Sequence, residues 1–516
     1  MSHLPILPVL IPLLTAGLLL VMHGMGTTSK RAVSSASVVS LVVISILLLS
    51  EASEGLIQAY RLGNWPAPFG IVLVVDRLAA LMVILTAILA AVVLLSALSG
   101  TDTQGRHFHV FFQLQIAGLN GAFLTGDLFN LFVFFEILLL ASYALLVHGG
   151  GLPRTRAGLA YVVVNLAGSA LFLIALGLTY GTLGTLNMAD LALVLPRIAS
   201  DDQAFVRTTL ALLNAVFVLK AALLPLGFWL PHVYTAATLP VAVLFVIMTK
   251  VGIYALLRVS TIGFVMAPFT ADLLHPWLAW LAIGTIALGS LGALAATRLS
   301  IVVANIVMIS SGTLLFGIAA GSITAHAALL YYLVNTTVVA AGLFLLTDLV
   351  SRHRGEVADV FAKGPRLTAI LTTGGAYLIL ALAASGAPPS SGFLAKIMVM
   401  QSLQNTNTAI GAWAALLLSG FVVALVLARA ASMFLWEPGR ADKYPSHPGQ
   451  VGQMPSNTRN SEIALLGMIA CTLVITLGAA PISAYTRATA EQIAMPASYV
   501  ESVLGDASAI KRERRL

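Results

Sequence analysis

The chain has 516 residues, of which 59% are hydrophobic and only 9% are charged, and its mean hydropathy is +0.97. A soluble domain carries about 25% charged residues, so this composition excludes a soluble globular protein. The formal net charge of +7 then reports orientation in a membrane, because basic residues gather in loops on one side. We therefore expect an integral membrane protein in contact with lipid, without a nucleic-acid partner.

The chain begins with "MSHLPILPVLIPLL", which has no basic stretch and no small-residue cleavage site, so we expect this apolar segment to remain as a helix. Apolar runs follow along nearly the whole chain, and strand signals are negligible. We predict an all-α integral membrane protein with about 14 transmembrane helices. The predicted spans are centred near Leu13, Val42, Val83, Ile116, Leu139, Phe172, Leu213, Phe245, Ile286, Met308, Val334, Ile379, Leu418 and Leu473.

Lys and Arg in alternate loops predict the orientation. The predicted cytoplasmic loops contain Lys30, Arg31, Arg106, Arg154, Arg156, Arg298, Arg352, Arg354, Lys363, Arg366, Arg440, Lys443 and Arg459. Both termini then lie outside. The basic tail "IKRERRL" disagrees with this orientation. Either the span count is off by one or, as we prefer, the tail has little weight in topology. Asp76 and Arg77, near the outer end of the third span, are predicted to be interfacial.

A lone carboxylate lies in the apolar fifth span, "LFVFFEILLLASYALLVHGG". Glu136 follows Asp127, at the mouth of this span, by about 13 Å at 1.5 Å per residue, which is near the middle of a hydrocarbon core roughly 30 Å thick. A charge at this depth costs about 2.5 to 3.5 kcal/mol, and such residues are usually functional. Glu136 is therefore the first candidate for an ion-translocation site.

Three lysines are predicted at similar depth, namely Lys220, Lys250 and Lys396. Glu136 and Lys220 could form a purely structural ion pair, but one carboxylate does not account for three buried lysines. We therefore favour a functional role. For Arg429, in the thirteenth span, two interpretations stay open: a side chain that extends to the cytoplasmic surface, or a functional cation.

Two of the predicted helices are interrupted by proline next to a lysine. Pro225 frees the carbonyl of Ala221, beside Lys220, because proline has no N–H to donate. Pro388 and Pro389 free the carbonyls of Ala384 and Ser385, a turn or two before Lys396. Freed carbonyls in lipid must meet protein or water, and paired broken helices in two halves of a chain are typical of transporters with inverted repeats.

Buried lysines next to a carboxylate can relay protons. Desolvation disfavours the ammonium and a nearby carboxylate stabilises it, so movement of Glu136 relative to Lys220 would release or retain a proton. Hydroxyl, amide and imidazole groups could line the path, and the candidates are Ser142, Tyr143, Asn165, Ser169, Thr249, Ser310, Ser311, His326, Tyr331, Asn335 and Thr336. The sequence has no phosphate-binding loop, dinucleotide fingerprint, haem site or cysteine-rich metal site. We therefore expect a transporter rather than an enzyme, with no cofactor and no metal.

Three motifs resemble a known family. "FFEILLLASYALLV", "LLNAVFVLKAALLPLGFWLPHVYTAATLPVAVLFVIMTKVGIYALLRV" and "SGAPPSSGFLAKIMV" are similar to the antiporter-like subunits shared by Mrp-type cation/proton antiporters and respiratory complex I. The resemblance covers about Ile71 to Trp436. The sequence of the first motif is most similar to that of the D-type subunits of the Mrp (Pha) antiporters.

The resemblance implies a fold, site residues and partners. It implies two inverted five-helix repeats with broken helices, at 107–258 and 275–435, after three N-terminal helices in 1–106. A flexible cytoplasmic loop at 436–460 and a last helix with the basic tail at 461–516 would follow. The family's essential glutamate matches Glu136, and its lysines match Lys220, Lys250 and Lys396. The chain would work with the A, B, C, E, F and G types of subunit in a bacterial inner membrane, moving protons and Na⁺ or K⁺ in pH homeostasis.

One motif departs from the family. Its members often carry one or two histidines and a lysine in the eleventh helix, where this chain has "LLYYLVNTTVVAAGLFLL", with Asn335, Thr336 and Ala340. The proton path there would rest on hydroxyl groups, His326 and water. Two alternatives to the antiporter stay open: a proton-pumping membrane subunit of a complex I or membrane-bound hydrogenase, and a scaffold subunit whose buried charges are structural.

Overall fold

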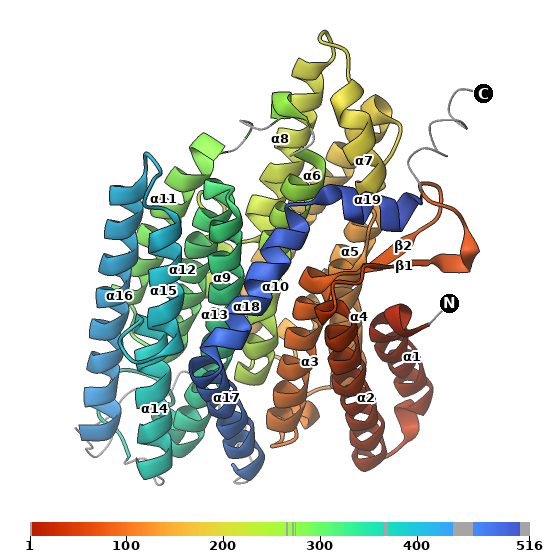
Figure 1. The fold of residues 1–516 in the computed structure, drawn as a ribbon. Helices are drawn as coiled ribbons and strands as arrows, with labels where there is room; N and C mark the ends of the chain where they lie inside the picture. Colours follow the sequence, from red (N-terminus) through yellow and green to blue (C-terminus); the bar gives the residue numbers. More distant parts are fainter. Residues whose placement is uncertain are drawn as a thin grey trace.

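The computed structural model describes residues 3–264, 267–270, 273, 275–365, 370–436 and 458–505. Figure 1 shows long helices packed side by side, with a small sheet at one edge. Most of the predicted loop at 436–460 and the basic tail lie outside the described residues, as does Arg366.

The first half of the chain forms ten α-helices and two strands within the described residues. They are α1 (Leu7–Val21), α2 (Thr27–Ser53), β1 (Gln58–Arg61), β2 (Val72–Val75), α3 (Arg77–Ala97), α4 (Phe108–Leu124), α5 (Leu128–Leu146), α6 (Leu152–Leu183), α7 (Met188–Val194), α8 (Gln203–Lys220), α9 (Trp229–Ala236) and α10 (Leu239–Val259). The second half contains α11 (His275–Leu294), α12 (Leu299–Ala320), α13 (Ile323–Arg354), α14 (Ile370–Ser385), α15 (Ser391–Ser402), α16 (Ala409–Ala431), α17 (Arg459–Leu477), α18 (Ala479–Ile493) and α19 (Pro496–Leu504).

The predicted membrane-spanning architecture is confirmed. Among the described residues, 12 helices are long and apolar enough to cross a membrane. Two shorter apolar helices, Phe108–Leu124 and Thr373–Ser385, coincide with two further predicted spans. The total of fourteen spans stays a prediction, because these two helices fall short of the about 20 residues that a membrane crossing usually needs.

The two-stranded sheet was not predicted. β1 and β2 pair antiparallel, and Leu73 of β2 forms a further bridge with Thr125, beyond the end of α4. All four residues of β2 are buried and apolar, so the sequence has no alternation that would distinguish this strand from the start of a helix. The end of the chain also differs from the single predicted helix, since α18 and α19 follow α17.

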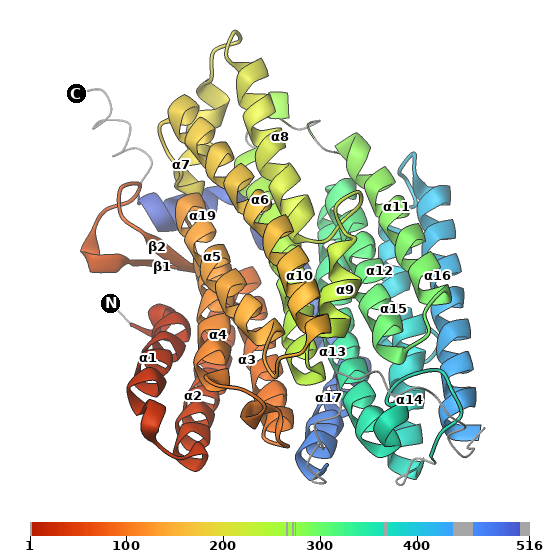
Figure 2. The same ribbon diagram turned by 180° about the vertical axis from the view of Figure 1, so that it is seen from behind.

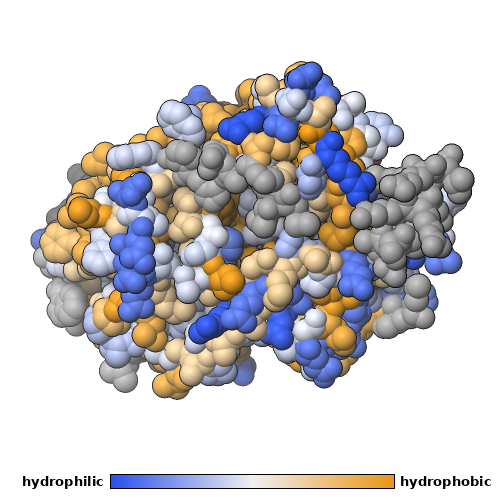
Figure 3. All heavy atoms as spheres, turned by 45° about the horizontal axis from the view of Figure 1, so that its top comes forward, coloured by the Kyte–Doolittle hydropathy of each residue, from blue (hydrophilic) through white to orange (hydrophobic). Residues whose placement is uncertain are grey.

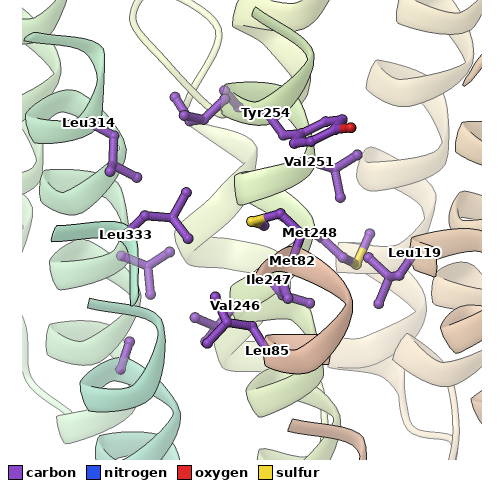
Figure 4. Close-up of a cluster of buried hydrophobic side chains, with 14 of the residues drawn as sticks. Met82, Leu85, Leu119, Val246, Ile247, Met248, Val251, Tyr254, Leu314 and Leu333 are labelled. Atoms are coloured by element: carbon purple, nitrogen blue, oxygen red, sulfur yellow. The ribbon is translucent and has the colours of Figure 1, made fainter. Parts of the chain in front are cut away.

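The core lies around α10, α12 and α13, whose described residues are almost all buried. Helices that are apolar on every face are typical of a protein core or of a membrane span. Figure 4 shows α10 between α4 on one side and α12 and α13 on the other, with α3 in front of it. The labelled core side chains are Met82, Leu85, Leu119, Val246, Ile247, Met248, Val251, Tyr254, Leu314 and Leu333.

Loops predicted to share one side of the membrane lie together in the structure. The His148 ring, after α5, is 2.8 Å from the carbonyl of Thr101, after α3. The guanidinium of Arg352, near the end of α13, donates to the carbonyl of Ser99 at 3.2 Å. The segment after α13 reaches the loop between α11 and α12, since the amide of Phe361 donates to the carbonyl of Thr297 at 2.9 Å. We call the side of the structure where these loops lie together the basic end. Figure 3 shows the opposite end, on which hydrophilic and apolar residues are interspersed.

The two predicted helix breaks are both present. α8 ends at Lys220, and the chain continues through a non-helical segment to α9. α14 ends at Ser385, and α15 begins at Ser391 after the segment that contains Pro388 and Pro389. Proline cannot donate the helical hydrogen bond, so each break follows from local sequence.

Candidate ion-translocation site

Glu136 and Lys220 meet through one hydroxyl group. The hydroxyl of Ser169, on α6, donates a hydrogen bond to the carboxylate of Glu136 on α5. Nζ of Lys220 lies 3.4 Å from the same hydroxyl oxygen. Lys220 is buried, with 5% of its surface exposed, and Glu136 is half-buried. A proton donor, a hydroxyl and an acceptor are thus in line across three helices.

Local structure holds both charged groups in position. The carboxylate of Asp127 caps α5 by accepting from the amide of Asn130 at 2.9 Å, which fixes the start of the helix that carries Glu136. Lys220 is the last residue of α8, and its Nζ lies 5.8 Å from the centre of the Phe135 ring. The face of the ring attracts the ammonium group. The ammonium group is therefore stabilised by the Phe135 ring and the Ser169 hydroxyl, and it forms no direct ion pair within the described residues.

Lys250 is fully buried in α10 and, among the described residues, bonds only to hydroxyl groups. Its Nζ donates to Oγ of Ser310 on α12 at 2.9 Å and lies 3.4 Å from Oγ1 of Thr249. The hydroxyl of Ser310 in turn donates to the carbonyl of Val307 at 2.6 Å. Two of the predicted lining residues, Thr249 and Ser310, therefore contact the predicted lysine.

Lys396 contacts the backbone freed by the second break. Its Nζ donates to the carbonyl of Ser385 at 2.7 Å, so the expectation that this carbonyl meets a polar group is confirmed. Two glycines provide the space that the Lys396 side chain occupies. A Cβ on Gly420 of α16 would lie 2.9 Å from Nζ, and a Cβ on Gly386 would lie 2.7 Å from Cδ of the lysine. Lys396 is half-buried.

Asn335 also lies at the second break. Its side-chain oxygen accepts from the hydroxyl of Ser391, the first residue of α15, at 2.7 Å. His326 is buried near the start of α13, nine residues earlier, which is about 13 Å along the helix. The structure therefore brings Asn335 to the break and does not bring His326 there.

The prolines of the two breaks and Arg429 are more exposed than the lysines. Pro225, Pro388 and Pro389 are exposed on the surface of the chain. Arg429 is exposed, and its guanidinium lies 5.6 Å from the ring centre of Phe361 at the basic end. For Arg429, the structure favours the interpretation in which the side chain extends to the membrane surface.

One buried ion pair was not predicted from the sequence. Asp76 and Arg258 are each 2% exposed and form a two-pronged pair, in which one Arg258 nitrogen lies 2.8 Å from an Asp76 oxygen. Tyr254 OH accepts from the same guanidinium at 3.0 Å and 3.1 Å. Asp76 caps the start of α3, so its place at the membrane interface stays a prediction. The contact between the start of α3 and the end of α10 was not predicted, because no local pattern indicates it.

The chain is similar to known subunits of membrane transporters. Residues 125–422 match the family model described as NADH:quinone oxidoreductase/Mrp antiporter, TM. The chain is 40% identical to the D subunit of a probable K⁺/H⁺ antiporter of Rhizobium meliloti (strain 1021), over 98% of both chains. It is 35% identical to the D subunit of the Na⁺/H⁺ antiporter of Alkalihalophilus pseudofirmus, over 98% of this chain and 100% of that protein.

The chain belongs to this family of antiporter D subunits. The predicted resemblance is therefore confirmed, and the relatives are named as subunits of transporters rather than as enzymes. This D-type chain is a multi-span membrane protein of the kind found in bacterial antiporter complexes.

Solved structures share its fold. A chain of the Mrp complex from Dietzia sp. DQ12-45-1b superimposes with a TM-score of 0.85 at 25% identity, covering 98% of this D-type chain and 100% of that one. A chain of respiratory complex I from Thermus thermophilus superimposes with a TM-score of 0.78 at 22% identity, covering 95% and 99%. The second likeness concerns the fold alone.

Proposed function

We propose that this protein is the proton-translocating D subunit of a multisubunit monovalent cation/proton antiporter. The observation that carries the proposal is the contact of Glu136 and Lys220 with one hydroxyl, that of Ser169, among the apolar helices of a membrane protein. A carboxylate and an ammonium separated by a rotatable hydroxyl can exchange a proton without forming a fixed ion pair. The antiporter names of relatives at 40% and 35% identity support the same function.

The proposed relay consists of Glu136, Lys220, Lys250 and Lys396. Each lysine has a hydroxyl or carbonyl acceptor within 3.4 Å, so each can hold a proton or release it to water. The broken helices supply backbone groups at two of these lysines, as in transporters with inverted repeats. On this basis, residues 107–258 and 275–435 form the two repeats, with the basic end toward the cytoplasm.

Two members of the relay lie at the surface of this chain. Glu136 and Lys396 are half-buried, whereas Lys220 and Lys250 are buried. A charged group cannot face lipid without a large cost, so neighbouring membrane subunits would cover these two positions. This argument favours a subunit of a larger complex, and the likeness to a chain of the Dietzia Mrp complex supports it.

The alternative function is proton pumping in a complex I or hydrogenase-type enzyme. The fold is compatible with it, as the likeness to the Thermus thermophilus complex indicates. The names of the more similar relatives favour the antiporter. A scaffold role is less compatible with the relay, because it gives no reason for lysines bonded to hydroxyl groups rather than carboxylates.

The function can be tested with the whole complex in membrane vesicles. Proton flux is measured with a pH-sensitive dye after addition of K⁺, Na⁺ or choline chloride. We expect K⁺ or Na⁺, and not choline, to drive proton movement. Flux that depends on a quinone and a reductant instead, with no response to either cation, would favour the respiratory alternative. Assembled complex without cation-dependent flux in any condition would contradict the antiporter function.

A further inference from the structure

A cavity lies at the basic end between α6, α9 and α12, and it has no part in the proposed relay. It holds about 490 Å³ and is open on one side. Figure 2 shows these three helices side by side on the face turned to the viewer. Its walls are mostly apolar and include Ala157, Ala160 and Val164 of α6, Val233 of α9 and Ile301 of α12.

The same cavity is also lined by an arginine and a histidine side chain. Arg156 and His232 line it, both are exposed, and neither has a hydrogen bond or ion pair from its side chain within the described residues. Arg298 also lines the cavity, but Asp359 already neutralises it, with 2.8 Å between the two groups. The unneutralised charge is therefore concentrated on the α6 and α9 sides.

The backbone adds to the positive potential at this place. No side chain caps the N-terminus of α6, where Gly151 is the first residue outside the helix. Arg156 lies in the first turns of this helix, so its charge and the free amide groups act in the same direction. Arg154 of the same turn donates to the carbonyl of Ala236 at 3.2 Å and closes the corner between α6 and α9.

We propose that this cavity binds an anionic phospholipid of the cytoplasmic leaflet. The phosphate would lie between Arg156 and His232, and an acyl chain would occupy the apolar wall. A cavity that is basic at the membrane surface and apolar toward the membrane interior matches the two ends of such a lipid. A free anion would match only the basic part, and a neutral lipid only the apolar part.

The bound lipid would contact the first helix break. Trp229 lines the cavity, and its indole N–H donates to the carbonyl of Leu219 at 3.4 Å. Leu219 directly precedes Lys220. An acyl chain against Trp229 would therefore restrict the motion of α9, which continues the broken helix.

Native mass spectrometry of the purified complex tests the proposal. The probes are phosphatidylglycerol and phosphatidylcholine with identical acyl chains, and glycerol phosphate without chains. We expect the complex to retain phosphatidylglycerol in preference to phosphatidylcholine. An Arg156→Gln, His232→Gln double variant should bind it roughly 30-fold more weakly, since each basic residue near the surface contributes roughly 1 kcal/mol and the variant removes two of them. Ala160→Phe, which fills the apolar wall and keeps both charged groups, should also weaken binding.

The control is Arg106→Gln, which removes an exposed arginine at the basic end that does not line the cavity. We expect it to bind phosphatidylglycerol as the unmodified complex does. Equal losses in the control and the double variant would overturn the proposal, because they would indicate general attraction to a basic surface. Unchanged binding of phosphatidylglycerol in the double variant would also overturn the proposal. Glycerol phosphate that competes as well as phosphatidylglycerol would overturn it too, because it would indicate a site for an anion only.

Discussion

The two broken helices hold their lysines in different ways. Lys220 ends α8, is buried, and reaches a carboxylate through the hydroxyl of Ser169. Lys396 lies within α15, is half-buried, and donates to the carbonyl of Ser385 on the other side of its own break. A side-chain partner can rotate or change its protonation state, whereas a backbone carbonyl cannot. The first lysine is therefore suited to be switched, and the second to be held next to a neighbouring subunit.

The largest effect is expected from Glu136→Gln. The amide keeps the shape of the side chain and can still accept from Ser169, but it carries no charge and cannot take up a proton. Cation-dependent proton flux should fall by about 100-fold or more, the usual contribution of a proton-transferring group. The measurement is vesicle flux divided by the amount of assembled complex. Near-normal flux in an assembled variant would remove Glu136 from the relay.

Lys220→Arg should have an effect of similar size. Arginine keeps the positive charge next to Ser169, but it does not release its proton at accessible pH. The variant should assemble and show flux close to that of Lys220→Ala. If the arginine variant transported while the alanine variant did not, Lys220 would be a fixed structural cation, and the contrast between the two lysines would disappear.

A Pro388→Ala, Pro389→Ala double variant tests the second break. Alanine can donate the helical hydrogen bonds that proline cannot, including the one to the carbonyl of Ser385. That carbonyl would then no longer accept from Lys396. We expect normal insertion and assembly with a loss of flux of about 30-fold, because displacement of a reacting group by about 1 Å can cost up to 100-fold. Flux equal to that of the unmodified complex would mean that the break is an incidental kink.

Ser169→Ala isolates the hydroxyl of the first break. It leaves Glu136 and Lys220 in place and removes their shared partner, so flux should fall about tenfold, as expected for a hydrogen bond to a charged group. Thr182→Ala on the same helix is the matched control, because the Thr182 hydroxyl bonds to carbonyls of its own helix, at 2.8 Å and 3.2 Å. A similar loss in both variants would indicate a general effect on α6.

Gly420→Ala should give the smallest effect. Its Cβ would lie 2.9 Å from Nζ of Lys396 and 2.8 Å from the carbonyl oxygen of Ser385, so these two groups must shift. We expect roughly a two- to threefold loss of flux, well below the effect of a larger displacement. Gly411→Ala, on the same helix, is the control, since its Cβ would meet only the flexible end of Ile283 at 3.3 Å. An unchanged Gly420→Ala variant would mean that Lys396 does not need this geometry.

Much of the architecture could be predicted from the sequence because the physical rules that decide it are local. Apolar runs of sufficient length specify membrane helices, and the 12 long apolar helices among the described residues confirm this. Proline removes a backbone donor wherever it occurs, so both breaks were predicted next to the correct lysines. The depth of Glu136 stays a prediction, which rests on the rise of one helix from Asp127. The strand β2 was missed because four consecutive buried residues have no period.

The partner of each charged group was decided only by the tertiary structure. The sequence by itself determined which side chains are costly in a membrane: Glu136 and the three lysines carry charge wherever they lie. It could not determine that Ser169, rather than any other predicted hydroxyl, joins Glu136 to Lys220, or that Asp76 meets Arg258 across 182 positions. Such contacts depend on how separate helices pack, and a hydroxyl or carboxylate has the same local sequence signal whether or not a partner faces it.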